Sequence, residues 1–181
     1  MKTLIYVVMF AVMLGTAIGV LFGPKIVENR KYSQHLEEGK KYFNIKQWSK
    51  AGTAFEKAIK VNPKNPDGYY HRGKTHFFLK FYNLALRDFN KALELEPDSY
   101  SVILARANVF VIWKEHEKAI QEFTRAINMD KTRPQPFYNR GITKAAMAHG
   151  AAAGCEDWKM SCNLNYQRAC VAVKKYCEYV R

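Results

Sequence analysis

Apolar side chains recur at helical spacing along most of the chain, most clearly in residues 66–99. The first half of this stretch places apolar or small residues near one helix face, at Tyr69, Tyr70, Gly73, Phe77 and Phe78. After a break at residues 80–82, the second half repeats the spacing at Leu84, Ala85, Leu86, Phe89, Ala92, Leu93 and Leu95. Pro97 ends the pattern, because proline lacks a backbone donor and disfavours helix at the residue before it. The stretch therefore predicts two amphipathic helices joined by a tight turn.

This unit recurs at a step of 34 residues. Small residues follow the step at Gly39, Gly73, Ala107 and Gly141, and alanines at Ala51, Ala85, Ala119 and Ala153. Phenylalanines follow it at Phe55, Phe89 and Phe123, and further alanines at Ala58, Ala92 and Ala126. A period of this length indicates a solenoid, in which each helix pair buries its apolar face against its neighbours. We expect Gly73 and Ala85 to let two helix backbones approach closely, and Phe89 to fill the space beside the next unit.

The order of small, bulky, alanine, phenylalanine, alanine and proline positions resembles the tetratricopeptide-repeat family over about residues 32–163. The resemblance implies an all-α solenoid with full repeats at residues 32–65, 66–99 and 100–133. We expect a degenerate fourth repeat at residues 134–163, where Asp157 and Trp158 replace the phenylalanine, and a capping helix at residues 164–181. Residues 154–159 are similar to the final repeat of many bacterial tetratricopeptide proteins.

The N-terminal segment has a different character. Residues 3–22 carry no charge, and Gly23 and Pro24 end the run. A helix of this length spans the roughly 30 Å hydrocarbon core of a bilayer. We expect residues 1–24 to form an uncleaved transmembrane anchor, followed by a linker at residues 25–31. The alternative is a secretory signal cleaved near residues 15–17, where the side chains are small.

All four cysteines lie near the C-terminus, at Cys155, Cys162, Cys170 and Cys177. The first two are seven residues apart, as are the last two, so each pair shares one helix face. If the chain turns back near residue 166, Cys155 faces Cys177 and Cys162 faces Cys170, one of three possible connectivities. We favour these disulfides, which would place the domain in an oxidising compartment. Four buried, reduced thiols are the alternative. Cysteines seven residues apart on a helix are roughly 10 Å apart, too far to share one zinc ion.

The formal net charge of +13 at pH 7 is spread along the chain and favours acidic partners. The sequence has no phosphate-binding glycine loop, nucleophile elbow or nucleic-acid-binding motif. Its five histidines are scattered without metal-ligand spacing. We therefore expect no enzymatic activity, cofactor, metal, nucleic-acid partner or small-molecule substrate. His76 stands at a bulky position of the repeat, where we expect it to pack in the core.

In the family that the chain resembles, the first helices of successive repeats form an inner face that holds an extended peptide or a partner helix. By repeat position, the resemblance implies a groove lined by Leu36, Lys40, Phe43, Tyr70, His71, Lys74, Phe77, Leu104, Asn108, Val111, Tyr138, Asn139 and Ile142. We expect it to take a protein segment with aliphatic or aromatic anchors and some negative charge.

Two points qualify this groove. Lys40, Lys74 and Asn108 match positions that clamp a C-terminal carboxylate in some family members, although apolar residues replace other parts of that clamp. The alternative to a binding groove is that Phe43 and Phe77 only pack helices together and the inner face holds no ligand.

The sequence thus predicts a non-catalytic scaffold or adaptor, tethered to a membrane through residues 3–22. A permanent structural subunit of a large membrane-associated complex is the alternative, and a lipid-surface binder driven by the positive charge is a third hypothesis. We expect the repeats to face the periplasm from a bacterial inner membrane. The alternatives are the intermembrane space at a mitochondrial inner membrane, or secretion after signal cleavage.

Overall fold

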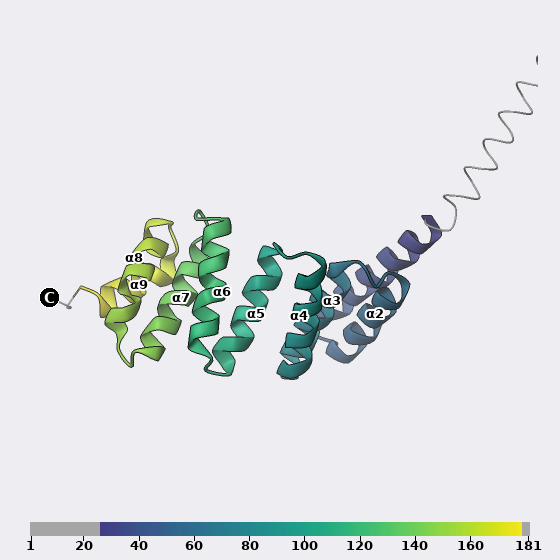
Figure 1. Cartoon of the computed structure of the whole chain (residues 1–181), viewed down its shortest axis with the longest axis horizontal. Helices are drawn as coiled ribbons and strands as arrows, with labels where there is room; N and C mark the ends of the chain where they lie inside the picture. The colour runs from purple at the N-terminus through teal and green to yellow at the C-terminus, as the bar shows by residue number, and fades with distance from the viewer. Residues whose placement is uncertain (1–25, 179–181) are drawn as a thin grey trace, which may run out of the picture.

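The computed structural model describes residues 26–178, which form a row of antiparallel helices without a β-strand among them (Figure 1). Residues 26–44 form a leading helix. The following helices are α2 (Trp48–Val61), α3 (Pro66–Phe78), α4 (Tyr82–Leu95), α5 (Tyr100–Ile112), α6 (His116–Met129), α7 (Pro134–Met147), the 3-10 helix η1 (Ala151–Gly154), α8 (Cys155–Asn163) and α9 (Gln167–Tyr176). Each helix packs on the next along the chain. This architecture is the all-helical solenoid that the sequence predicts.

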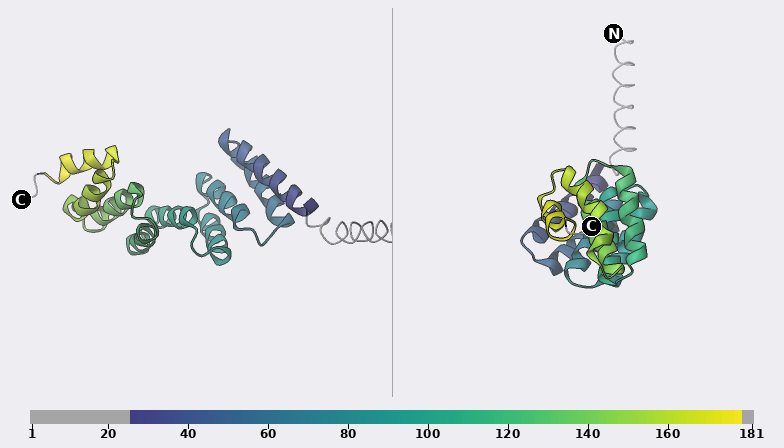
Figure 2. Two further views of the ribbon diagram at one scale, coloured as in Figure 1. Left: turned by 90° about the horizontal axis from the view of Figure 1, so that it is seen from above. Right: turned by 90° about the vertical axis from the view of Figure 1, so that its left-hand side faces the viewer.

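The stack is elongated, with the leading helix at one end and α9 at the other (Figure 2). The leading helix pairs with α2, α3 with α4, α5 with α6, and α7 with α8, while α9 covers the last pair. Each pair buries apolar surface both between its own two helices and against the adjacent pairs, so the stability of the domain is a sum of local contacts.

Local sequence sets where the helices begin and end. Pro66 opens α3, and the side chain of Asn65 accepts a hydrogen bond of 2.9 Å from the backbone amide of Asp67. The turn within each of the first three pairs has a lysine in the left-handed conformation, with φ of 60° at Lys46, 63° at Lys80 and 59° at Lys114. These turns repeat at the 34-residue step, so the backbone follows the period of the sequence.

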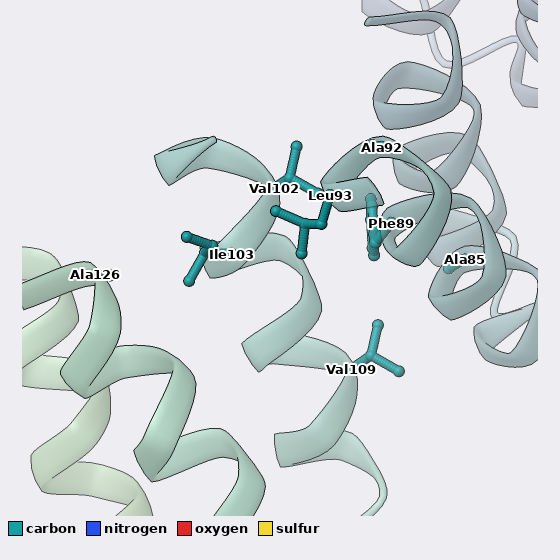
Figure 3. Packing of buried hydrophobic residues seen from close by; sticks show 8 residues of the cluster. All are labelled: Ala85, Phe89, Ala92, Leu93, Val102, Ile103, Val109 and Ala126. Atoms are coloured by element: carbon teal, nitrogen blue, oxygen red, sulfur yellow. The ribbon is translucent and has the colours of Figure 1, made fainter. Parts of the chain in front are cut away.

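The core of each pair joins a phenylalanine to a small residue. Phe55, Phe89 and Phe123 are fully buried. A Cβ atom added to Gly73 would lie 2.7 Å from the Phe89 ring, so the absence of a side chain there makes room for the phenylalanine. Figure 3 shows the largest buried cluster, in which Phe89 and Leu93 of α4 lie beside Val102 of α5.

The fourth pair contains one residue more than the 34-residue step allows. Its left-handed turn residue is His149, which lies 35 residues after Lys114. As a result Trp158 packs on Gly141 in the way that Phe89 packs on Gly73, with 2.7 Å between the ring and a Cβ added to Gly141. Ala153 stands on the 34-residue step but is exposed, and Gly154 is buried in the equivalent place against the carbonyl of Gly141.

A second repeated feature is an ion pair between the two helices of a pair. Arg72 Nη2 lies 2.7 Å from Asp88 Oδ1, and two further pairs with the same arrangement are Arg106–Glu122 and Arg140–Asp157, both at 2.6 Å. The residues are 16 apart in the first two pairs and 17 apart in the third, so the extra residue of the fourth pair is visible here too. Asp88 and Asp157 are buried, so removing Arg72 or Arg140 would leave a buried charge without its arginine partner.

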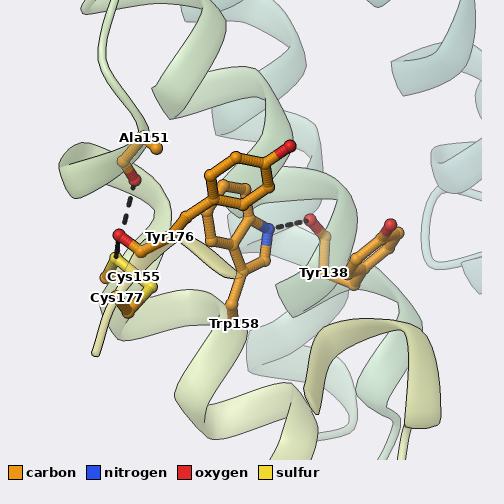
Figure 4. Close-up of a disulfide and its surroundings, with 6 residues drawn as sticks. All are labelled: Tyr138, Ala151, Cys155, Trp158, Tyr176 and Cys177. Carbon is orange, nitrogen blue, oxygen red and sulfur yellow. Dashed lines mark hydrogen bonds between the residues drawn. A yellow bond between two sulfur atoms is a disulfide. The ribbon is translucent and has the colours of Figure 1, made fainter. Parts of the chain in front are cut away.

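The C-terminal cap contains two disulfides, Cys155–Cys177 and Cys162–Cys170, the pairing that the cysteine spacing favours. The indole of Trp158 donates a hydrogen bond of 3.3 Å to the backbone carbonyl of Tyr138, and the ring of Tyr176 lies over it (Figure 4). The cap therefore covers the last repeated pair and is covalently closed.

Within residues 26–178 no helix is long and apolar enough to cross a membrane. The anchor predicted at residues 3–22 lies outside the part of the chain that the structure describes.

Candidate functional site

A groove opens between the first helices of the second, third and fourth pairs, with a cavity volume of about 370 Å³. It is lined by Tyr70, Lys74, Phe77, Phe78, Phe89, Tyr100, Ser101, Leu104, Ala105, Asn108, Arg133 and Gln135. These residues come from α3, α4, α5 and the start of α7. Three of them are phenylalanines, two are tyrosines, and none of the described lining residues is Asp or Glu.

Lys74 supplies one positive charge to the groove. Its Nζ lies 4.9 Å from the centroid of the Phe43 ring and 5.3 Å from that of Tyr70, so the ammonium group rests between two aromatic faces. Burial lowers the pKa of Lys74. Among residues 26–178, no carboxylate forms an ion pair with it, and a carboxylate from a bound segment would therefore restore part of its lost solvation.

Arg133 supplies the second charge from the other side of α5. Its guanidinium stacks on the ring of Tyr100 at 4.3 Å, and its Nε lies 2.8 Å from Asp130 Oδ2. The groove thus has an apolar, aromatic wall with a cation on each flank, while Ser101, Asn108 and Gln135 offer neutral hydrogen-bonding groups.

Five of the residues predicted for the groove line this cavity: Tyr70, Lys74, Phe77, Leu104 and Asn108. The remaining eight are placed elsewhere on the inner face or in the packing between helices. Leu36 has only 6% of its surface exposed and packs in the first core cluster. Lys40 pairs with Glu37 at 2.8 Å. Phe43 contacts Trp48 and Phe78, with ring centroids 4.8 and 5.4 Å away.

On the third and fourth pairs the predicted lining also serves the packing of helices. Val111 packs against the cluster of Ala107 and Phe123. Tyr138 contacts Tyr166, with ring centroids 5.2 Å apart. The backbone carbonyl of Asn139 accepts the hydroxyl of Thr143 at 2.8 Å, and Ile142 is 40% exposed.

His71 belongs to the wall between the groove and the core. Its ring stacks on Phe55, with centroids 5.3 Å apart. Burial, with a smaller contribution from the nearby Lys74 and Lys40 charges, lowers the pKa of His71 to about 4. The imidazole is therefore neutral at physiological pH and contributes an aromatic surface rather than a charge.

Sequence reasoning missed several groove residues, chiefly Phe78, Tyr100, Ser101, Ala105, Arg133 and Gln135. Ala105 could have been found, because it stands 34 residues after His71. Tyr100, Arg133 and Gln135 lie at or just before the start of a first helix, and their approach to the groove depends on how successive pairs are stacked.

His76 has a polar role that its position in the repeat did not predict. Its Nδ1 lies 3.0 Å from Asp88 Oδ2, beside the Arg72 guanidinium. Burial alone would raise the pKa of Asp88, but hydrogen bonds from His76 and Arg72 outweigh it and lower that pKa. This cluster joins α3 to α4, and in the described part of the chain no three His, Cys, Asp or Glu side chains gather as metal ligands.

Two family models match the chain: one described as TPR repeat over residues 39–79, and one as tetratricopeptide repeat over residues 66–99. Together the two models match residues 39–99, about a third of the chain. The helix pairs α3–α4 and α5–α6 have the same arrangement of buried phenylalanine and small residue, so the repeats continue beyond the matched range in the structure. No curated protein matches the sequence.

Solved structures share the fold of this chain. The pilF protein of Pseudomonas aeruginosa has a TM-score of 0.71 at 19% identity, covering 82% of this chain and 70% of its own. YrrB, described as a TPR protein with an unusual peptide-binding site, has a TM-score of 0.69 at 18% identity and 88% coverage of each chain. The first TPR of Spaghetti (RPAP3), bound to the HSP90 peptide SRMEEVD, has a TM-score of 0.64 at 22% identity, covering 66% of this chain and 94% of its own. At these identities the likeness shows the fold alone.

Proposed function

We propose that this protein is a non-catalytic interaction scaffold whose groove between α3, α5 and α7 binds an extended segment of a partner protein. The segment carries aromatic or aliphatic anchors and acidic groups. The observation that supports this proposal is the composition of the lining: aromatic rings and two cations, with no carboxylate among the described lining residues. The solved relatives with peptide-binding sites support the same kind of ligand.

The energetics of such a groove favour aromatic anchors. Tyr70 and Phe77 are already held by neighbouring helices, so binding costs little of their conformational freedom. Lys74 is fixed over Phe43 and Tyr70, so a carboxylate that reaches it finds a partly desolvated, pre-positioned cation. Apolar contacts would supply most of the affinity, and the two cations would select for acidic segments.

Residues 3–22 are proposed to tether the scaffold to a membrane, because their length and lack of charge suit a spanning helix. The two disulfides of the cap favour an oxidising compartment on the side of the repeats. We therefore favour the periplasmic face of a bacterial inner membrane. The intermembrane space of mitochondria and secretion after signal cleavage are the alternatives.

A permanent structural role is a second candidate, in which the groove holds one partner for the lifetime of a membrane-associated complex. Apolar side chains that remain exposed on the described domain favour it, notably Phe81 and Phe78 at 54% and 51% exposure. Exchange of a labelled peptide from the groove separates the two candidates, because a permanent subunit would not release its partner on the time scale of purification.

The experiment that tests the binding proposal is selection of ligands from a random 12-residue peptide library displayed on phage, using the full-length chain in nanodiscs. We expect the selected peptides to combine aromatic or aliphatic residues with Asp or Glu. Lys74→Glu should weaken their binding by about tenfold or more, because it places like charges together. Lys57→Glu is the matched control, since Lys57 is an exposed lysine of α2 outside the groove. Selected peptides without acidic residues, or equal losses in both variants, would refute the proposed ligand.

A further inference from the structure

A second apolar surface lies along the turns that join the two helices of each pair. We call it the turn rim and define it by Ile45, Trp48, Phe78, Phe81, Leu84 and Trp113; Phe78 also lines the groove. Ile45, Phe81 and Phe78 are 55%, 54% and 51% exposed. Large apolar side chains gathered in this way on a solvent-exposed surface indicate an interaction site.

The turn rim is continuous across three helix pairs. Trp48 of the first pair stacks on Phe78 of the second, with ring centroids 5.0 Å apart and an angle of 12° between the rings. Trp48 also shares a furrow of about 420 Å³ with Phe81 and Leu84. A neighbouring furrow of about 410 Å³ joins Phe81 and Leu84 to Trp113 of the third pair. The second furrow is mostly apolar, whereas the first is also lined by polar and charged side chains, among them Glu56, Arg72 and Arg87. Apolar side chains of a bound segment can therefore enter the second furrow and the Phe81–Leu84 side of the first.

Lysines frame this strip at a regular interval. Lys46, Lys80 and Lys114 occupy the left-handed position of successive turns and are all exposed. Glycine adopts this conformation at lower cost, so local stability does not call for lysine there. The carboxylate beside Lys114, Glu115, is held by Lys118 at 2.6 Å. The three turn lysines therefore present positive charge to the solvent along the apolar strip.

We propose that the turn rim is a second docking surface, and that its occupant is an acidic amphipathic segment of a protein. Aromatic or aliphatic side chains on one face of the segment enter the furrows beside Phe81 and Leu84. Carboxylates at the margin of the segment meet the turn lysines. Charge complementarity identifies the occupant, because an apolar strip framed by lysines disfavours a basic or neutral segment.

The position of the turn rim favours a protein over a lipid surface. The leading helix begins its described part at residue 26 and ends beside the rim at residue 44, so its two ends are roughly 27 Å apart. Residue 26 is the described residue nearest to the proposed anchor. A membrane that holds residues 3–22 would therefore meet the opposite end of the leading helix, and the rim would remain open to a partner. The preference for a protein over a membrane rests on the proposed anchor, whereas the apolar strip and its lysines are observed independently of it.

The test uses tryptophan as an internal probe, because Trp48 and Trp113 lie on the rim while Trp158 is buried in the cap. The full-length chain carrying Lys74→Glu, which weakens the groove, is placed in nanodiscs of phosphatidylcholine and phosphatidylglycerol at a ratio of 3:1. Peptides are then selected on it from a random 12-residue phage library. We expect acidic peptides with aromatic or aliphatic residues that shift tryptophan emission to shorter wavelength and reduce its quenching by iodide.

Two variants keep the proposal falsifiable. Phe81→Ser with Leu84→Ser should weaken these peptides about tenfold or more, and Lys80→Glu, an exposed change that spares the core, should weaken them about threefold or more. Peptides from the groove selection should bind the rim variants with the same affinity as the unmodified protein. This result separates a failure of the rim proposal from a failure of the groove proposal. Selected peptides that lack acidic residues, or whose affinity is unchanged by these substitutions, would overturn the proposal. Quenching of Trp48 and Trp113 by brominated lipids in the nanodisc would overturn it in favour of a membrane surface.

Discussion

The ring of Phe89 occupies the space where Gly73 has no side chain. A Cβ atom at Gly73 would lie 2.7 Å from Cε1 of that ring and 3.1 Å from Cβ of Asp88. The missing methyl group therefore lets α3 and α4 approach closely enough for Arg72 to reach Asp88 from the neighbouring position. One contact thus links the 34-residue period to both the apolar core and the buried ion pair.

Gly73→Ala should lower the free energy of unfolding by about 1–3 kcal/mol, because the buried Phe89 ring must shift to accept the methyl group. Gly52→Ala is the matched control: its Cβ would meet Thr75 at 3.7 Å, an ordinary contact, and the better helix propensity of alanine should stabilise by about 0.5–1 kcal/mol. Urea unfolding measures both. Stabilisation by both substitutions would contradict the packing described here.

Lys114→Gly should stabilise the domain by about 0.5–1 kcal/mol, because glycine adopts the observed φ of 59° without the strain that a Cβ atom causes. Lys57→Gly, in the interior of α2, should destabilise by about 1 kcal/mol. Thermal unfolding of the two variants and of the unmodified protein tests whether the two changes in stability have opposite signs. A loss of stability in Lys114→Gly would mean that the lysine side chain makes contacts that stabilise the turn.

His71 should make the domain less stable in mild acid. Its folded-state pKa of about 4 lies below the ordinary value of 6.5, so its contribution is fully present above about pH 6.5 and is lost as the pH falls towards 4. The loss should be roughly 2 kcal/mol, allowing for the solvent that reaches the half-buried ring. In His71→Phe, which keeps the aromatic contact with Phe55, this part of the pH dependence should vanish. His149→Gln, an exposed position, should leave it intact.

Removing the disulfides should weaken the cap according to the length of the closed loop. The loop between Cys155 and Cys177 spans 22 residues and that between Cys162 and Cys170 spans 8. Loop-closure entropy predicts losses of about 3.4 and about 2.5 kcal/mol for the paired alanine variants. Urea unfolding with and without reductant measures these losses. The free energy of unfolding of a variant that lacks both disulfides should not change when reductant is added. An unmodified protein that is indifferent to reductant would show that the cysteines are free in solution.

The sequence was sufficient to predict the helices and the order in which they stack, because each helix pair repeats the same local packing. Phe55, Phe89 and Phe123 could be placed in the core from their spacing alone. The position of the extra residue in the fourth pair could not be predicted, since residues 145–154 are mostly Ala and Gly, and their two larger side chains, Met147 and His149, are exposed and pack in no core that would fix the alignment. The observed contact of Trp158 with Gly141 resolves it.

The groove was predicted less completely than the fold. The repeat positions located Tyr70, Lys74 and Leu104, which project from the middle of first helices. They did not locate Arg133, whose place depends on its stacking over Tyr100. Nor did they show that Leu36 is buried, because exposure on the inner face depends on the angle between successive pairs, which no single repeat encodes.

The most direct test of the central claim is to map where a bound peptide lies. A groove-selected acidic peptide carrying a benzophenone side chain is cross-linked to the full-length chain in nanodiscs, and the attached residues are found by mass spectrometry. We predict attachment to α3 and α5 near Tyr70 and Leu104, reduced by about tenfold in Lys74→Glu and unchanged in Lys57→Glu. Attachment confined to the outer helices α2, α4 and α6, with no effect of Lys74→Glu, would contradict the assignment of the groove as the binding site.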